Sequence, residues 1–220
     1  MSPIRGEQAR RYRVTRGALD VYLRHMASDF SVELPLTLRR RNGEAELVAR
    51  ARAGDHEAYA SLVRPHERIA FRVATAITGW SADAEEATQN GLVKAYRSLD
   101  RFKAGSAFRP WLLRIVVNEA HNVLRAERRH QRLGLRAAEQ HDAAPPSPDE
   151  AVLAREELET VLGALRRLPE ADRVAIALRY FAELPDPEAA ALLGASQEAY
   201  RVRLLRARRR LQTLLEETDV

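Results

Sequence analysis

Hydrophobic residues recur every three or four positions along nearly all of the chain after residue 44, and almost no segment alternates with period two. This spacing gathers the apolar side chains on one face of an α-helix. The sequence therefore predicts an all-α protein. The expected helices cover residues 44–53, 55–64, 65–78, 81–100, 107–130, 149–167, 170–182, 187–193 and 197–216.

Residues that start helices stand at the predicted boundaries. Aspartate and serine side chains at an N-cap accept a free backbone N–H, and proline fits the first helical turn. We expect Asp55, Ser81, Asp186 and Ser196 to be N-caps, and Pro65 to lie in a first turn.

Residues 131–148, "QRLGLRAAEQHDAAPPSP", have no steady apolar period and end in three prolines within four residues. Such a segment is typical of a flexible linker. The predicted architecture is therefore two small helical domains, residues 44–130 and 149–220, joined by residues 131–148. Residues 1–43 form a basic N-terminal extension, either a mobile tail (or the product of an upstream start codon) or an ordered accessory element.

Composition excludes several classes of protein. The chain has 220 residues and no cysteine, which rules out disulfides, thiolate zinc sites and thiol catalysis and suits a reducing cytoplasm. No apolar run approaches the roughly 20 residues that span a bilayer, so we expect neither secretion nor membrane insertion. The acids at 83, 85 and 86 are expected to pair with a helix dipole, and the histidines lack metal-binding spacing. We expect no catalytic site, metal or cofactor.

The net charge of +5 is unevenly distributed. Nine basic and two acidic residues lie between 101 and 136, and six basic and three acidic residues lie between 199 and 220. The segments 137–150 and 151–198 are acidic on balance. Two separate basic blocks predict two places where a polyanion is held.

The C-terminal basic block has the form of a helix-turn-helix. A short helix rich in Ala and Leu meets Gly194, and an Arg-rich helix begins after Ser196. In this motif the second helix enters the major groove of DNA. Leu204, Leu211 and Leu215 are expected to face the core. The alternative interpretation is an ordinary αα-corner with a solvated basic face.

The other basic block contains "SAFRPWLLRIVVNEAHN", residues 106–122. Its apolar stripe, which includes Trp111, is expected to face the core. Phenylalanines in and beside the preceding loop are suited to hold an unstacked base, and stacking contributes about 1–3 kcal/mol per base. Amides read base edges and arginines hold phosphates, so the opposite face predicts contact with a separated DNA strand. That face is expected to carry no carboxylate and consists of Arg114, Asn118, His121, Asn122 and Arg125.

Two motifs together resemble the extracytoplasmic-function group of bacterial RNA polymerase sigma factors. The first is "DAEEATQNGLVKAYRSLDRFKAGSAFRPWLLRIVVNEAHNVL", and the second, beyond the linker, is "LRRLPEADRVAIALRYFAELPDPEAAALLGASQEAYRVRLLRARRRL". They correspond to the family's second and fourth conserved regions. The resemblance implies a protein that binds core RNA polymerase and promoter DNA and that an anti-sigma factor holds inactive.

The resemblance also implies a role for individual residues. The polymerase-binding set is Asp83, Glu86, Gln89, Leu92 and Tyr96. The set for the minus-ten element is Phe102, Ser106, Phe108, Arg114, Asn118, Asn122 and Arg125. The set for the minus-thirty-five element is Ser196, Arg201, Arg203, Leu205 and Arg206.

The chain departs from the family pattern at two places. Residues 87–92 lose apolar surface on the polymerase-binding helix and put Gly91 inside it, at a cost of about 1 kcal/mol relative to alanine. At residues 198–203, near the start of the recognition helix, this chain lacks hydroxyl side chains that the family pattern has. The first change is expected to alter docking on polymerase, and the second to alter the promoter sequence that is read.

Two other functions fit parts of the sequence. An autonomous helix-turn-helix regulator would bind duplex DNA unaided and would keep this activity without residues 44–130. A helical adaptor that does not bind DNA would be insensitive to neutralisation of its basic faces.

Overall fold

The computed structural model describes residues 23, 40–103, 105–133 and 150–218, and within these ranges it contains helices and no strand. This confirms the all-α prediction. The N-terminal helices are α3 (Arg40–Arg52), α4 (His56–Val63), α5 (Glu67–Thr78), α6 (Ser81–Arg97) and α7 (Phe108–Arg132). The C-terminal helices are α8 (Glu150–Arg167), α9 (Glu170–Ile176), α10 (Asp186–Leu192) and α11 (Gln197–Thr218). Shorter turns are η2 (Arg64–His66), η3 (Leu99–Arg101) and the π-helical η4 (Ala177–Phe181).

Most predicted boundaries lie within a few residues of those observed, with three corrections. Helix α3 begins at Arg40, inside the predicted N-terminal extension. Helix α6 begins at Ser81 with Trp80 as its N-cap, so Ser81 is not the cap. Helix α10 begins at Asp186 with Pro185 as its N-cap, so Asp186 is the first helical residue and not the cap. The rest of the extension, apart from Leu23, and residues 134–149 of the predicted linker region lie outside the described residues. Leu23 is fully buried in the hydrophobic core.

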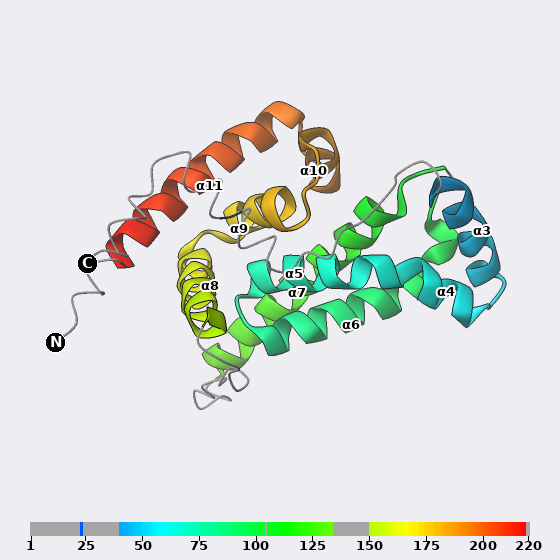
Figure 1. The fold of residues 1–220 in the computed structure, drawn as a ribbon, viewed down its shortest axis with the longest axis horizontal. Helices are drawn as coiled ribbons and strands as arrows, with labels where there is room; N and C mark the ends of the chain where they lie inside the picture. Colours follow the sequence, from blue (N-terminus) through cyan, green and yellow to red (C-terminus); the bar gives the residue numbers. More distant parts are fainter. Residues whose placement is uncertain (1–22, 24–39, 104, 134–149, 219–220) are drawn as a thin grey trace.

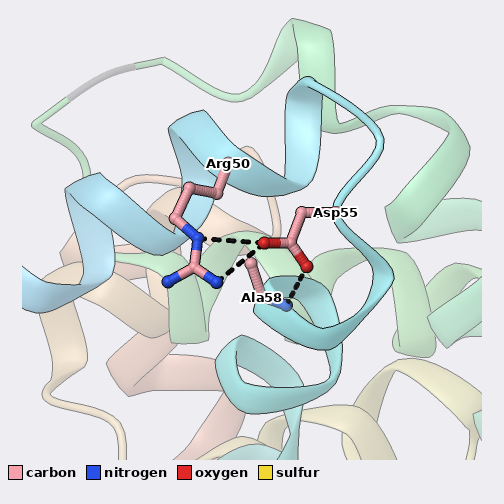
Figure 2. A network of polar contacts seen from close by, with 3 residues as sticks. All are labelled: Arg50, Asp55 and Ala58. Carbon is pink, nitrogen blue, oxygen red and sulfur yellow. Dashed lines mark hydrogen bonds and ion pairs between the residues drawn. The ribbon is translucent and has the colours of Figure 1, made fainter.

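The predicted cap at Asp55 is confirmed (Figure 2). One carboxylate oxygen accepts the backbone N–H of Ala58 at 2.9 Å, and the other accepts Nε and Nη2 of Arg50 at 2.9 and 2.7 Å. The Ala58 hydrogen bond, followed by the Arg50 contact, lowers the pKa of Asp55 because both favour its ionised form. At the last helix, Ser196 Oγ accepts the N–H of Ala199 at 3.1 Å, which confirms Ser196 as a cap.

Helices α5, α6 and α7 pack against one another in the middle of the molecule, and α5 also contacts α8, α9 and η4 (Figure 1). Helix α10 contacts α7. The C-terminal helices therefore lie directly against the N-terminal helices, and buried residues of both form one hydrophobic cluster. In Figure 1, α3 and α4 lie at the end of the N-terminal helices farthest from α8 and α11.

Gly91 has a packing role in this arrangement. It is buried where α6 crosses α7, and a Cβ atom added there would lie 2.8 Å from Cγ2 and 3.2 Å from Cα of Val116. A glycine is needed because the two helices approach too closely for a side chain. The glycine that departs from the family pattern thus supports the contact between α6 and α7.

Candidate nucleic-acid interface

The predicted stripe on α7 lies largely on the surface. Arg114, Asn118, Asn122 and Arg125 are exposed and His121 is half-buried. The opposite side of the helix is buried, as the apolar period predicts, and consists of Leu112, Leu113, Val116, Val117 and Ala120. Helix α7 therefore presents amides and arginines above a rigid core.

The expectation that this face has no carboxylate is wrong. Glu119 lies beside the stripe, and its Oε1 accepts Nδ2 of Asn122 at 3.3 Å. The same oxygen forms an ion pair of 2.6 Å with Nζ of Lys94 on α6. Glu119 thus orients the Asn122 amide while Lys94 balances its charge. The sequence analysis missed Glu119, because the sequence does not show how far a neighbouring side chain reaches across the helix surface.

The aromatic residues around the loop form a cluster. Phe102 and Phe108 are 5% and 0% exposed, with ring centroids 5.7 Å apart in an edge-to-face arrangement. The Trp111 ring packs 5.2 Å from Phe102 and 5.5 Å from Phe108, in agreement with its predicted place in the core. In this conformation the two phenylalanine rings contact one another and Trp111, so neither is open to a base. Ser106 lies exposed in the loop.

Arg52 is a residue of this region that the sequence analysis missed. From α3 its Nε donates to the carbonyl of Leu99 at 3.1 Å, and its Nη2 donates to the carbonyl of Phe102. Arg52 therefore fixes the chain just before the loop that leads into α7. No sequence signal marks it, because an arginine on a helix ordinarily indicates a solvated face.

The recognition helix α11 presents most of its predicted contacts to solvent. Its exposed residues include Ser196 at the cap and Arg201, Arg203, Leu205 and Arg206. Leu204, Leu211 and Leu215 are buried, as predicted. Val202 is 43% exposed among the arginines and was missed.

Tyr200 explains part of the departure at residues 198–203. It is 1% exposed, and its hydroxyl donates to the carbonyl of Ala175 on α9 at 3.2 Å. This position on α11 therefore anchors the helix in the C-terminal core. Arg201, one residue later, points outward and forms an ion pair of 2.8 Å with Asp186 at the start of α10.

The predicted polymerase-binding residues on α6 divide into two groups. Glu86 and Gln89 are exposed, whereas Asp83 and Leu92 are half-buried. Tyr96 is also half-buried, and its ring packs 4.9 Å from that of Tyr59 and 5.4 Å from His56. Val93, which the sequence analysis did not select, is 50% exposed. The exposed face of α6 therefore runs through Glu86, Gln89 and Val93.

The C-terminal helices contact the basic side of α7. Arg114 donates to the carbonyl of Ala191 at 3.0 Å, and Arg109 donates to the carbonyl of Ala182. Arg128 forms an ion pair of 3.0 Å with Glu170, whose other oxygen lies 3.4 Å from Nδ1 of His121. The conformation seen here thus occupies part of the predicted strand-binding face.

A second set of contacts joins α8 to the end of α5. Arg166 donates to the carbonyl of Gly79 at 2.9 Å, and its guanidinium lies 4.1 Å from the centre of the Trp80 ring. Gly79 has φ of +83°, and a Cβ there would lie 2.3 Å from Cγ of Arg166. Glycine is therefore required both by the backbone and by the approach of α8.

Burial shifts the pKa of two side chains where α7 meets the C-terminal helices. It lowers the pKa of Arg109, which Glu183 and Glu188 oppose by favouring the charged form. Burial also lowers the pKa of His121, against the opposing effect of Glu170. The positive charges facing His121 lower its pKa further and belong to Arg125, Arg173 and Arg128. The imidazole is thus held toward its neutral form.

The described residues show neither a metal site nor a membrane span. No group of three or more His, Cys, Asp or Glu side chains among them is placed to hold a metal ion. In the same residues, no helix combines the length and apolar character needed to cross a bilayer.

Comparison with protein families gives two matches in order along the chain. A model of sigma-70 region 2 matches residues 62–130, and a model of sigma-70 region 4 matches residues 158–211. The RNA polymerase sigma factor NccH of Alcaligenes xylosoxydans xylosoxydans is 34% identical over 177 residues, which cover 79% of this chain and 95% of NccH. The ECF RNA polymerase sigma-E factor of Escherichia coli K12 is 34% identical over 172 residues, which cover 74% of this chain and 88% of that sigma-E factor.

Two solved structures are similar to most of the chain. CnrH in complex with the cytosolic domain of CnrY aligns with a TM-score of 0.61 at 30% identity, covering 80% of this chain and 98% of CnrH. The sigma factor RpoE in complex with the anti-sigma factor NepR, from Bartonella quintana, aligns with a TM-score of 0.55 at 30% identity. The alignment covers 74% of this chain and 97% of the matched chain.

Proposed function

This chain belongs to the extracytoplasmic-function sigma factors of bacterial RNA polymerase, and from that premise we propose how its helices divide the work of promoter recognition. A sigma factor binds core polymerase and directs it to promoters. The N-terminal helices α3–α7 form the domain that docks on polymerase and binds the minus-ten element. The C-terminal helices α8–α11 form the domain that binds the minus-thirty-five element.

The single observation that carries the minus-ten assignment is the exposed row of amides and arginines on α7 above a fully buried core face. Arg114 and Arg125 hold phosphates, and Asn118 and Asn122 contact bases of the separated strand. Ser106 lies in the loop beside them. Because Phe102 and Phe108 are buried against Trp111, they act by holding the loop in place in this conformation.

The minus-thirty-five assignment is supported by the exposed side chains of α11. Ser196 and the N–H groups at the helix start face phosphate, and arginines beyond them reach the major groove. Arg201, Arg203 and Arg206 provide the charged contacts, and Leu205 provides apolar contact with bases. Val202 adds a second apolar contact.

The polymerase contact is assigned to the exposed face of α6. Glu86 and Gln89 supply polar groups, and Val93 adds to the apolar surface that the half-buried Leu92 and Tyr96 expose only in part. Asp83, near the start of α6, lies on the edge of this face.

We assign no catalytic step to the chain, since initiation factors position polymerase and leave the chemistry to it. The protein works in the cytoplasm, where polymerase and promoter meet. Its regulatory partner is an anti-sigma factor, and the support for this is that similar chains were solved in complex with CnrY and NepR.

Reconstituted transcription tests the proposal. Purified chain and core polymerase are incubated with fragmented genomic DNA, and initiated transcripts are sequenced to reveal both promoter elements. Asn118→Ala is then compared with Gln212→Ala, a change from amide to alanine far along α11. Loss of a base contact is expected to lower transcript yield by roughly an order of magnitude for Asn118→Ala, because such contacts contribute about 1–3 kcal/mol. Binding of both variants to polymerase stays unchanged.

Three outcomes contradict the proposal. Transcripts that do not require the chain would argue against a sigma factor acting here. Loss of polymerase binding by Asn118→Ala would show that α7 docks on the enzyme and does not read DNA. Specific duplex binding by the free chain that survives deletion of residues 44–130 would favour the autonomous regulator instead.

A further inference from the structure

We propose that Asp186 is a positioning residue for promoter recognition, because it holds the Arg201 side chain ready to read a guanine of the minus-thirty-five element. The inference rests on the proposed role of α11 and deepens it. It names the base that one arginine reads and the residue that orients this arginine. Asp186 itself is not expected to touch DNA.

The carboxylate of Asp186 lies between two arginines of the C-terminal helices. Its Oδ2 accepts Nε of Arg201 on α11 at 2.8 Å, and its Oδ1 lies 3.8 Å from Nη1 of Arg179 on η4. The Asp186 side chain is 22% exposed, whereas that of Arg201 is 62% exposed. Most of the carboxylate side chain is thus covered by protein, and most of the arginine side chain is open to solvent.

The backbone around Asp186 is rigid. Asp186 is the first residue of α10 and stands between Pro185 and Pro187, whose rings fix their φ angles. Ala189 and Ala190, in the following turn, are buried, and α10 packs against α11 (Figure 1). Asp186 therefore presents its carboxylate at a fixed place beside α11.

The backbone that carries Arg201 is held as well. Its neighbour Tyr200 is 1% exposed and donates a hydrogen bond to the carbonyl of Ala175 at 3.2 Å. With its backbone anchored and its Nε paired, the Arg201 side chain is fixed at both ends. Ordering a long side chain before it binds reduces the entropy lost on binding, so this arrangement favours recognition of DNA.

The pairing of Arg201 through Nε leaves the end of its guanidinium for DNA. Within the part of the chain that the structure describes, Nη1 and Nη2 of Arg201 have no hydrogen-bond partner. These two groups form a fork that matches O6 and N7 of guanine in the major groove. A contact that only neutralised phosphate would not need this orientation. The geometry therefore favours base reading by Arg201.

The charges around Asp186 are compatible with this role. Arg179 and Arg201 face the single carboxylate, so the group as a whole stays positive toward DNA. Exposed ion pairs contribute little to the stability of a fold, because water screens them. The contact between Asp186 and Arg201 is thus better explained by orientation of the arginine than by folding.

The first experiment measures base preference with the full chain and core polymerase. A promoter found by sequencing transcripts from the reconstituted reaction is prepared with each base pair of its minus-thirty-five element varied in turn. With the parent chain, we expect one guanine whose replacement lowers transcript yield at least about fivefold, and we expect Arg201→Ala to abolish this preference. An unchanged preference in Arg201→Ala would overturn the assignment of the guanine to this arginine.

The second experiment removes the carboxylate that holds Nε. Asp186→Ala is expected to lower the preference for that guanine at least about threefold and to leave the preferences at other base pairs unchanged, because only Arg201 loses its orientation. Glu188→Ala is the matched control, since it removes an equal charge from an exposed side chain in the same turn of α10. The control is expected to keep the preference of the parent. Equal preferences in Asp186→Ala and Glu188→Ala would overturn the positioning role.

Two further variants separate positioning from a general effect of charge or folding. Asp186→Glu keeps a carboxylate and is expected to restore at least part of the guanine preference. In the Arg201→Ala background, Asp186→Ala is expected to change no base preference, because residues that act as one unit are not additive. A changed preference in that background would show that Asp186 acts without Arg201 and would overturn the proposal.

The outcomes distinguish this inference from the proposed function on which it rests. Base preference compares templates transcribed with one and the same variant, so a smaller amount of folded protein does not alter it. Absence of transcripts that depend on the parent chain would overturn both proposals. Transcripts with a guanine preference that Asp186→Ala leaves unchanged would overturn the positioning role of Asp186 alone.

Discussion

Replacing Gly91 by alanine tests whether the glycine on α6 exists for helix packing. In an ordinary helix this change stabilises a protein by up to about 1 kcal/mol, because alanine restricts the unfolded chain and favours the helix. In this structure the new Cβ would lie 2.8 Å from Cγ2 of Val116 and 3.2 Å from its Cα. The favourable and unfavourable effects therefore oppose one another at this site.

The magnitude of the clash decides the sign. A valine on a helix has one strongly preferred χ1 rotamer, so Cγ2 cannot turn away at low cost. The Cα of Val116 belongs to the α7 backbone, so the two helices must also separate by a few tenths of an ångström. Overpacking of this kind costs about 1–3 kcal/mol. Gly91→Ala is thus expected to reduce the free energy of unfolding by about 1 kcal/mol, the difference between the two effects.

Gly163 on α8 provides the matched control, because a Cβ there would meet only the end of the Arg166 side chain at 3.7 Å. Gly163→Ala is expected to stabilise by up to about 1 kcal/mol. Urea denaturation followed by circular dichroism measures the free energy of unfolding of both variants. In thermal denaturation, their melting temperatures should differ by about 4–8 °C, at about 2–4 °C per kcal/mol for a chain of this size. Stabilisation of Gly91→Ala equal to that of Gly163→Ala would refute the packing explanation.

Three further changes test other parts of the structure. Tyr200→Phe removes a buried hydrogen bond to Ala175 and is expected to lower the free energy of unfolding by about 1 kcal/mol in urea titrations; no change would show that the bond contributes nothing. Burial lowers the pKa of His121, so as the pH drops below 6.5 the unfolded chain binds a proton at this residue before the folded chain does, and the free energy of unfolding should fall. The difference in this free energy between pH 7.5 and pH 5.5, measured by denaturation, should be smaller in His121→Gln than in the parent chain. Val93→Asp should weaken binding to core polymerase at least about tenfold with unchanged helicity, and unchanged binding would move the docking face elsewhere on the chain.

The sequence predicted the helices well because their determinants are local. Apolar residues at helical spacing define the buried face of α7, and short polar side chains such as Asp55 and Ser196 begin helices through bonds to residues three positions away. These contacts are contained within one helical turn or two. The exposure of the arginines on α11 followed equally from the period of the leucines between them.

The sequence did not show features that depend on contacts between distant segments. A base contact by Phe102 and Phe108 stays a prediction, and in this conformation both rings pack against Trp111, which lies one turn after Phe108 on α7. Gly91 suggested a weakened helix, although its lack of a side chain is what admits Val116. Neither result can be obtained from one helix alone, because each depends on how closely a second element approaches.

The segregation of charge along the chain explains how its two groups of helices contact one another. Residues 151–198 are acidic on balance, and within them Glu170 pairs with Arg128, while Glu183 and Glu188 act on Arg109. A surface built to attract phosphate attracts any array of oxygen atoms on the same chain, unless the two are kept apart. The chain joins its basic and acidic segments in one molecule, so the acidic segment is present at high effective concentration. The contacts that Glu170, Glu183 and Glu188 make with arginines of α7 therefore follow from the same segregation of charge that predicted the basic face.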